Sequence, residues 1–123
     1  MTERSLRNCR VLVAEDEYML AEEMREELES DGAVVLGPAA TVAQALDLIA
    51  AESQIHAAVM DVNLRGEKIF PAIEALVVRG VPTVLTTGYD EAEIPERFRT
   101  LPRCGKPVNM KLVTRAVGRA MGW

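Results

Sequence analysis

Runs of apolar, mostly β-branched residues alternate along the chain with amphipathic stretches. A continuous apolar run of about five residues is typical of a strand covered on both faces, whereas apolar residues three or four positions apart indicate a helix with one buried stripe. The apolar runs predict strands at residues 10–15, 33–38, 57–61, 81–88 and 102–104. The amphipathic stretches predict helices at residues 16–32, 41–52, 67–79 and 111–121.

The same spacing predicts how the helices begin and end and which side chains they bury. Thr41 and Gln44 have the spacing of a capping box, and Asn109 is a candidate cap for the last helix. Gly32 and Gly80 are candidate stops for the first and third helices. The side chains predicted to be buried are Met19, Leu20, Met24, Leu28, Val42, Ala45, Leu46, Ile49, Ile69, Phe70, Ile73, Leu76, Val77, Leu112, Val113, Ala116 and Val117, with Met60 in the third strand.

The stretch from residue 89 to 105 is the least clear part of the pattern. It contains Pro95 and Pro102 and has no long apolar stripe, so any helix here must be short or irregular. A fifth strand near 102–104 is expected because the alternation requires one, not because its own residues indicate one. Few apolar side chains are available to hold this segment on the sheet, so we expect it to be the least ordered part of the free protein.

Strands without polar–apolar alternation, separated by helices, predict a parallel sheet with helices on both faces. Because right-handed crossovers leave few topologies, we expect a flavodoxin-like α/β fold, a doubly wound five-stranded parallel sheet with strand order 2-1-3-4-5. Residues 1–123 have the size of a single domain. In such a fold a binding site lies at the carboxyl ends of the strands, near the switch point between the first and third strands.

The charge of the chain narrows the classes of function. Against 14 Lys and Arg residues stand 19 Asp and Glu residues, a net charge of −5. This balance argues against a nucleic-acid partner, since a protein that follows phosphates usually has a basic face. No apolar run is long enough for a membrane span and no signal-peptide pattern opens the chain, so we expect no membrane association and a cytoplasmic location. Cys9 and Cys104 are interpreted as reduced thiols and His56 as a surface residue.

Charged and hydroxyl side chains follow several of the predicted strands. Glu15 and Asp16 end the first strand, Asp61 ends the third, Thr87 lies at the end of the fourth, and Lys106 follows the fifth. Because the carboxyl ends of parallel strands meet at one edge of the sheet, we expect these side chains to converge there. Clustered carboxylates repel one another unless a cation lies among them, and oxygen ligands suit Mg²⁺.

Together these residues resemble the receiver domains of two-component response regulators. The resemblance covers nearly the whole chain and rests on the acidic pair Glu15–Asp16, on Asp61, on Thr87, and on Lys106 with the proline that follows it. The segments VLTTGYD and RCGKPV further resemble the subfamily of single-domain receivers named after a FATGUY motif.

The resemblance implies a phosphorylation site with a metal ion. Asp61 is implied as the phosphoacceptor, which takes a phosphoryl group from a histidine kinase or a histidine phosphotransfer protein in an Mg²⁺-dependent reaction. Asp16 and the backbone carbonyl of Asn63 are implied as direct metal ligands beside Asp61, and Glu15 as a ligand through water.

Thr87 and Lys106 are implied to contact the phosphoryl oxygens, and Lys106 to pair with Asp61 before the transfer. The implied function is that of a phosphorylation-controlled protein-binding module rather than an enzyme. We expect a stand-alone receiver, because the chain ends at Trp123 just past the last predicted helix. Residues 89–105 lie between Thr87 and Lys106, so we expect them to respond to phosphorylation by partial ordering.

The sequence departs from the family pattern at two positions. Arg103 stands where receivers usually carry an aromatic switch residue, three positions before Lys106, which leaves Tyr89 as the aromatic candidate for that role. Arg65 stands where a proline is usual, four residues after Asp61.

Two alternatives stay open. A phosphatase of the haloacid dehalogenase type also uses an Asp nucleophile with Thr, Lys and Mg²⁺. It needs a cap domain and a second acid two residues after the nucleophile, where this chain has Asn63. The other alternative is a pseudo-receiver that binds partners without phosphorylation, and the complete acceptor set argues against it.

Overall fold

The computed structural model of the chain describes residues 6–88 and 91–122. Within these residues, five strands form one parallel sheet in the order β2-β1-β3-β6-β7. Numbered within the sheet alone, this is the order 2-1-3-4-5, so the predicted flavodoxin-like topology is confirmed. The strands are β1 (Arg10–Ala14), β2 (Val34–Ala39), β3 (Ala57–Asp61), β6 (Thr83–Thr87) and β7 (Arg103–Gly105).

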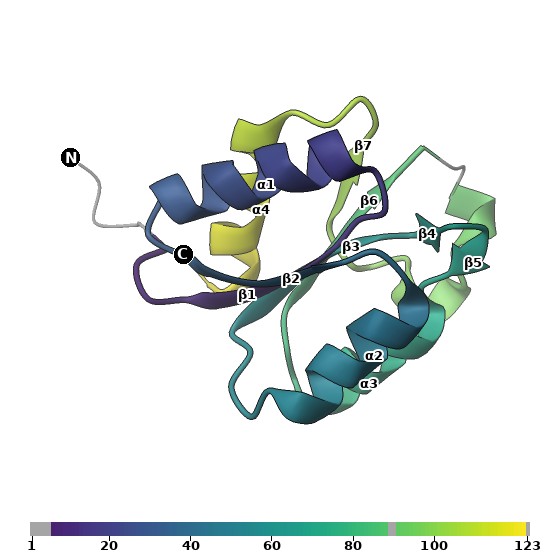
Figure 1. Ribbon diagram of the computed structural model, residues 1–123. Helices are drawn as coiled ribbons and strands as arrows, with labels where there is room; N and C mark the ends of the chain where they lie inside the picture. Colours follow the sequence, from purple (N-terminus) through teal and green to yellow (C-terminus); the bar gives the residue numbers. More distant parts are fainter. Residues whose placement is uncertain (1–5, 89–90, 123) are drawn as a thin grey trace.

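The α-helices of the described residues cover both faces of this sheet (Figure 1). One face carries α1 (Tyr18–Ser30) and α4 (Met110–Ala120), and the other carries α2 (Val42–Ala51) and α3 (Phe70–Val78). Because successive strand residues point to opposite faces, the strands contribute to two apolar cores. The core under α1 and α4 includes Val11, Val13, Met24, Leu28, Val59, Val113 and Val117, and the core under α2 and α3 includes Leu12, Ile49, Met60, Ile73, Leu76 and Leu85.

Four side chains predicted to be buried are exposed instead. They are Met19 (68%), Leu46 (37%), Val77 (44%) and Leu112 (50%). In the last three cases the neighbouring residue along the helix is the buried one, and a single step along a helix turns the side chain by about 100°. Each helix lies against the sheet along a stripe narrower than the apolar stripe of its sequence. The other predicted side chains are buried or half-buried.

The predicted caps of α2 and α4 are present. Thr41 Oγ1 accepts a hydrogen bond from the Gln44 N–H (3.1 Å), and Gln44 Oε1 accepts one from the Ala40 N–H (2.8 Å). Asn109 Oδ1 accepts hydrogen bonds from the N–H groups of the second and third residues of α4. These side chains satisfy backbone donors that have no partner inside a helix.

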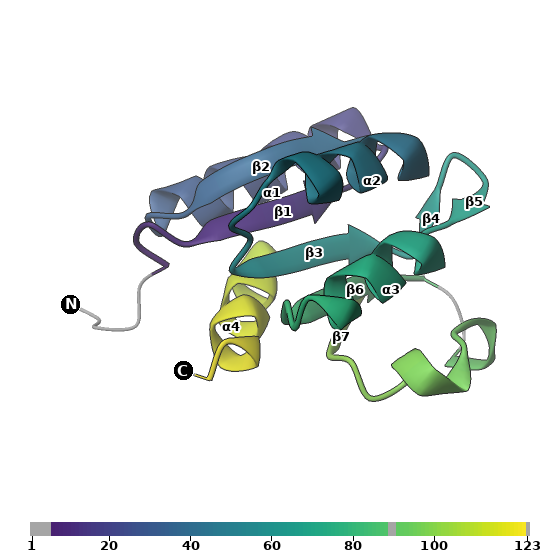
Figure 2. The ribbon, with the colours of Figure 1, turned by 90° about the horizontal axis from the view of Figure 1, so that it is seen from below.

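A hairpin replaces the first turn of the helix predicted at 67–79. Strands β4 (Asn63–Leu64) and β5 (Glu67–Lys68) pair antiparallel, and α3 begins only at Phe70. The two turn residues, Arg65 and Gly66, have φ angles of +50° and +85°, and positive φ at both positions gives a two-residue turn the twist that a hairpin needs. The hairpin lies beyond the carboxyl end of β3 (Figures 1 and 2).

The described part of the 89–105 segment contains two short 3-10 helices, at Glu91–Glu93 and Glu96–Phe98. The prediction of a short or irregular helix is therefore confirmed. Two of the few apolar side chains of the segment, Ile94 (0% exposed) and Phe98 (3%), nevertheless belong to the core under α2 and α3 and anchor its described part. The Phe98 ring also stacks on that of Phe70, with 6.0 Å between the ring centroids. That this segment is the least ordered part of the free protein stays a prediction.

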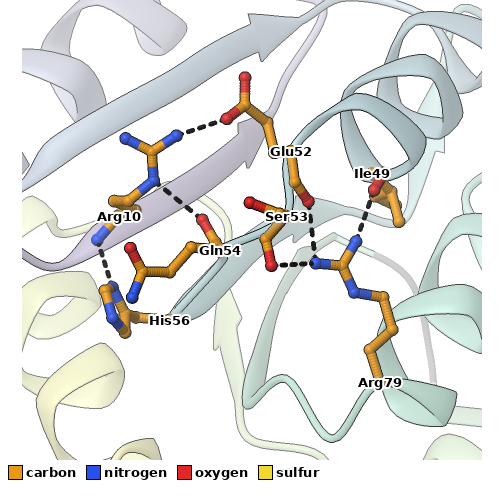
Figure 3. A network of polar contacts seen from close by, with 7 residues as sticks. All are labelled: Arg10, Ile49, Glu52, Ser53, Gln54, His56 and Arg79. Carbon is orange, nitrogen blue, oxygen red and sulfur yellow. Dashed lines mark hydrogen bonds and ion pairs between the residues drawn. The ribbon is translucent and has the colours of Figure 1, made fainter.

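Arg79 binds the carboxyl end of α2, near the edge of the sheet at which the strands begin (Figure 3). Its guanidinium donates hydrogen bonds to the carbonyl oxygens of Ile49 (2.5 Å), Glu52 (2.9 Å) and Ser53 (3.1 Å). The last carbonyls of a helix lack intrahelical partners and carry partial negative charge. The guanidinium of Arg79 thus satisfies several of these carbonyl oxygens at once.

Arg10, the first residue of β1, binds the loop that follows α2. Its guanidinium donates to the Gln54 carbonyl (2.9 Å) and pairs with the Glu52 carboxylate, while its main-chain N–H donates to Nδ1 of His56 (2.8 Å). His56 is therefore half-buried and hydrogen-bonded rather than a plain surface residue.

We expect Arg79→Ala to lower the free energy of unfolding by about 1 kcal/mol, because three carbonyl oxygens lose a charged donor at a partly exposed site. Arg115→Ala is the matched control, because Arg115 is an exposed arginine on α4 and its removal should change stability by less than about 0.5 kcal/mol. Urea denaturation of both variants measures the difference, and equal losses would contradict a capping role for Arg79.

Both cysteines are half-buried free thiols, and burial raises the pKa of each, so they stay protonated at neutral pH. Among the described residues, no helix combines the length and apolar character needed to cross a bilayer.

Candidate functional site

Three carboxylates come together at the carboxyl ends of β1 and β3. Glu15 and Asp16 directly follow β1, and Asp61 is the last residue of β3. These strands are parallel neighbours with Ala14 beside Met60, so their ends lie level. One carboxylate oxygen from each acid lies within 4.8 Å of the other two. The structure thus brings together the three acids that the sequence placed at this edge of the sheet.

Asp61 is almost fully buried, at 3% exposed, and is held by two hydrogen bonds. Its Oδ1 accepts from the Asn63 N–H (3.2 Å), and its Oδ2 accepts from Lys106 Nζ (2.7 Å). A carboxylate can be taken out of water when a cation and hydrogen bonds compensate it. This pairing explains how an apolar strand can end in an ionised residue.

Lys106 reaches the acids from the loop that follows β7. Its main-chain N–H donates to the Thr87 carbonyl at the end of β6 (3.1 Å), and its Nζ also lies 3.8 Å from Glu15 Oε1. Burial opposes the charged form of Lys106, but the hydrogen bond to Asp61 and the negative charges around it outweigh burial and raise the pKa of the ammonium. Lys106 is therefore a positive counter-ion at neutral pH.

Glu15 is the most deeply buried of the three acids, at 2% exposed, and one of its oxygens lacks a hydrogen bond within the described part of the chain. Its Oε2 accepts from the Glu17 N–H (3.0 Å), whereas its Oε1 is buried and accepts no hydrogen bond from the described residues. Burial raises the pKa of Glu15 to about 7, and the charge of Asp61 adds to the increase, while the Glu17 N–H and Lys106 act against it. Among the residues that the structure describes, three acids face Lys106, so this part of the site carries excess negative charge.

We expect Glu15→Gln to stabilise the metal-free protein at neutral pH. The pKa of Glu15 is raised from its usual 4.5 to about 7 on folding, so loss of its proton disfavours the folded state. The stability of the wild type relative to the variant is therefore unchanged below pH 4.5, falls as the pH rises from 4.5 to about 7, and is constant above that.

Urea denaturation of both proteins in EDTA across this pH range measures the difference. A difference that does not vary with pH would contradict this account, because it would mean that the carboxylate charge of Glu15 plays no part.

The donor set fits a hard divalent cation such as Mg²⁺, which binds one or two carboxylates and keeps several waters. The buried Oε1 of Glu15 accepts no hydrogen bond from the described residues, and a water bound to such a cation would supply one. Asp16, Asp61, Asn63, Gly88 and Lys106 line an open hollow of about 330 Å³, which has room for a hydrated cation.

Arg65 makes a contact at this site that the sequence did not reveal. Its main-chain N–H, in the turn of the β4–β5 hairpin, donates to Oδ2 of Asp16 at 2.7 Å. Gly66 is the sequence signal for a turn here, but the helical spacing of the residues that follow obscured it. Nothing in the pattern indicates that the turn contacts Asp16.

The other predicted residues lie as follows. Thr87 is the buried last residue of β6, next to Gly88 in the wall of the hollow. Arg103, in the place of the usual aromatic switch, is exposed on β7, and its guanidinium donates to the Arg99 carbonyl (3.3 Å). Tyr89 lies outside the described residues, and so does its suggested part in switching.

No protein-family model and no curated protein matches the chain, but solved structures do. The solution structure of SdrG from Sphingomonas melonis Fr1 is 37% identical with a TM-score of 0.79, and the match covers 93% of this chain and 96% of SdrG. The receiver (REC) domain of the PhyR response regulator from Erythrobacter litoralis is 25% identical with a TM-score of 0.80, over 94% of this chain and 92% of that domain. The response regulator PhyR from Brucella abortus is 27% identical with a TM-score of 0.77, over 93% of this chain and 48% of PhyR.

The doubly wound sheet, the acidic cluster at its switch point and these similarities define a receiver domain. The chain belongs to the family of response regulator receiver domains. This is the family that the sequence resembles, so that resemblance is confirmed. The alternative of a phosphatase of the haloacid dehalogenase type finds no support among these similarities.

Proposed function

We propose that this chain accepts a phosphoryl group on Asp61 from the phosphohistidine of a kinase or of a phosphotransfer protein, in a reaction that needs Mg²⁺. The observation that carries the proposal is the hydrogen bond between the buried Asp61 carboxylate and Lys106 Nζ (2.7 Å), beside two further acids. A second support is that SdrG, 36% identical over 91% of this chain, has been solved in a BeF3-activated conformation. Beryllofluoride adducts mimic acyl phosphates.

In the proposed step, a carboxylate oxygen of Asp61 forms a bond to phosphorus as the bond from phosphorus to the donor's imidazole nitrogen breaks. The electron pair of that bond stays on the imidazole, and the product is an aspartyl phosphate. Lys106 balances charge on the phosphoryl oxygens, and the Thr87 hydroxyl donates a hydrogen bond to one of them. Such transfer depends on positioning and charge neutralisation, which fixed groups supply without reorganisation.

Asp16, Asp61 and the backbone carbonyl of Asn63 would hold the Mg²⁺ directly, and Glu15 would hold it through water. The bound cation supplies positive charge that offsets both the acidic cluster and the incoming phosphoryl oxygens. Bound there, the cation would also offset the negative charge of the buried Glu15 carboxylate.

The product of this reaction is a signal rather than a released compound. We propose that the chain is a phosphoacceptor, not an enzyme with a separate substrate, and that phosphorylation changes its affinity for a downstream protein. The described residues between Thr87 and Lys106 adjoin both groups that would contact the phosphoryl oxygens, so residues 91–105 are where we expect the change in conformation.

Intact-mass spectrometry after incubation with acetyl phosphate tests the proposal. We expect a gain of one phosphate with Mg²⁺ and none when EDTA removes the cation. A chain that gains no phosphate under either condition would be a pseudo-receiver, which binds partners without phosphorylation.

A further inference from the structure

The turn of the β4–β5 hairpin contacts a proposed cation ligand through its main chain. The Arg65 N–H donates to Oδ2 of Asp16 at 2.7 Å, across 49 positions of sequence. A hydrogen bond from an amide to an ionised carboxylate is about twice as strong as one between neutral groups. It fixes one oxygen of Asp16 and therefore the direction in which the other points.

We propose that the Arg65 amide is a positioning group for the Asp16 carboxylate, which makes the hairpin part of the cation site. The inference rests on the proposed function, because it requires Asp16 to be a cation ligand. A ligand that is already oriented by an outer hydrogen bond loses less conformational freedom when the metal binds. Outer partners of this kind typically change metal affinity by about 10–100-fold.

The backbone of the turn explains why this position is not a proline here. Proline holds φ near −65° and has no N–H, whereas Arg65 has a φ of +50° and donates its N–H to Asp16. A proline would therefore abolish both the turn and the contact. The side chain of Arg65 is exposed, and the contact is made by the main chain alone.

The hairpin is also joined to Asp61 and to the segment before β7. At its base the Asn63 N–H donates to Asp61 Oδ1 (3.2 Å), and on β5 Lys68 Nζ lies 3.7 Å from Glu93 Oε1 in the first 3-10 helix. The hairpin thus contacts two of the three acids and the segment that we expect to respond to phosphorylation. Coupling between sites is reciprocal, so a cation that binds better to the ordered hairpin also favours that order.

The first experiment detects the hydrogen bond itself, by amide hydrogen exchange of metal-free protein. We expect Asp16→Ala to remove the protection of the Arg65 amide and to shift its NMR resonance, since the acceptor is gone. Glu15→Ala is the matched control, because it deletes the neighbouring acid and leaves the acceptor in place. Equal protection of the Arg65 amide in both variants would overturn the proposal, since a hairpin stable in itself would not depend on Asp16.

The second experiment measures Mg²⁺ affinity in a pair of proteins that differ in a single backbone group. The first carries Arg65→Ala, and the second carries the same side chain with the N–H of residue 65 replaced by an ester oxygen. We expect the ester to bind Mg²⁺ about tenfold more weakly or worse, as judged by NMR titration. Contacts between Asn63 and Lys68, which pair across the hairpin, show whether the hairpin is still formed in the ester.

The outcomes separate this inference from the proposed function. If the wild-type chain binds no Mg²⁺, the proposed function fails, and a positioning role fails with it. If the wild type binds Mg²⁺ and the amide and ester proteins bind it equally well with the hairpin intact, the positioning role alone is wrong.

Discussion

The Asp61→Asn variant should gain no phosphate from acetyl phosphate and Mg²⁺, whereas the wild-type chain should gain one. Asparagine keeps the size of the side chain but replaces a negatively charged oxygen with an amide group, which is a far poorer nucleophile toward phosphorus. It also weakens the hydrogen bond with Lys106, because a neutral oxygen is a weaker acceptor of an ammonium N–H than a carboxylate. The expected effect is complete loss of the covalent product.

Asp47→Asn is the matched control, because it makes the same chemical change at an exposed aspartate on α2, away from the site. Intact mass is recorded for both variants and the wild type under the same conditions. A phosphate gain in Asp61→Asn would mean that another residue is the acceptor, and the assignment of Asp61 in the proposed function would be wrong.

The second large effect is expected at Phe98, which anchors the segment between β6 and β7. Its side chain is 3% exposed, stacks on Phe70 and packs in the core under α2 and α3. We expect Phe98→Ala to lower the free energy of unfolding by about 3 kcal/mol, because buried Phe-to-Ala changes remove transfer energy and leave a cavity. The Arg97 guanidinium, 4.5 Å from the centre of the same ring, would lose its contact as well.

The loss should be local as well as global. We expect amide hydrogen exchange in residues 91–101 to be faster in Phe98→Ala than in the wild type when the two proteins are compared at the same global free energy of unfolding. The reason is that Ile94 would then be the main remaining apolar anchor of the segment. Tyr18→Ala is the control, since Tyr18 is 75% exposed and its removal should change stability by less than about 0.5 kcal/mol. A loss below about 1 kcal/mol in Phe98→Ala would show that the segment is held elsewhere.

This anchoring changes the expected response to phosphorylation. The described residues of the segment are already attached to the core through Ile94 and Phe98. A shift of Thr87 and Lys106 on phosphorylation should therefore increase the order of the segment by less than the sequence suggested. We still expect residues 91–105 to respond, because they connect those two groups. Hydrogen exchange of the free and beryllofluoride-bound chain measures how much order is gained.

The amino-acid sequence is enough to predict the sheet and the edge at which the site lies. Strand–helix alternation with right-handed crossovers allows few topologies, and the carboxyl ends of neighbouring parallel strands meet. For that reason the sequence places Glu15, Asp16 and Asp61 together and Lys106 beside them, as the structure does. Local signals sufficed for the caps as well, because Thr41 and Asn109 act within three residues of their own positions.

Other contacts between segments distant in sequence could not be predicted in this way, because they depend on how the whole chain packs. Three features of the structure correspond to no periodic pattern in the chain. They are the hydrogen bond from Arg65 to Asp16, the stacking of Phe98 on Phe70, and the hairpin that precedes α3. Val77 and Leu112 show the same limit, since the apolar stripe of a helix is wider than the strip that the sheet covers. Periodicity reports the average environment of a helix or strand, whereas the partner of a particular side chain depends on how the whole chain packs.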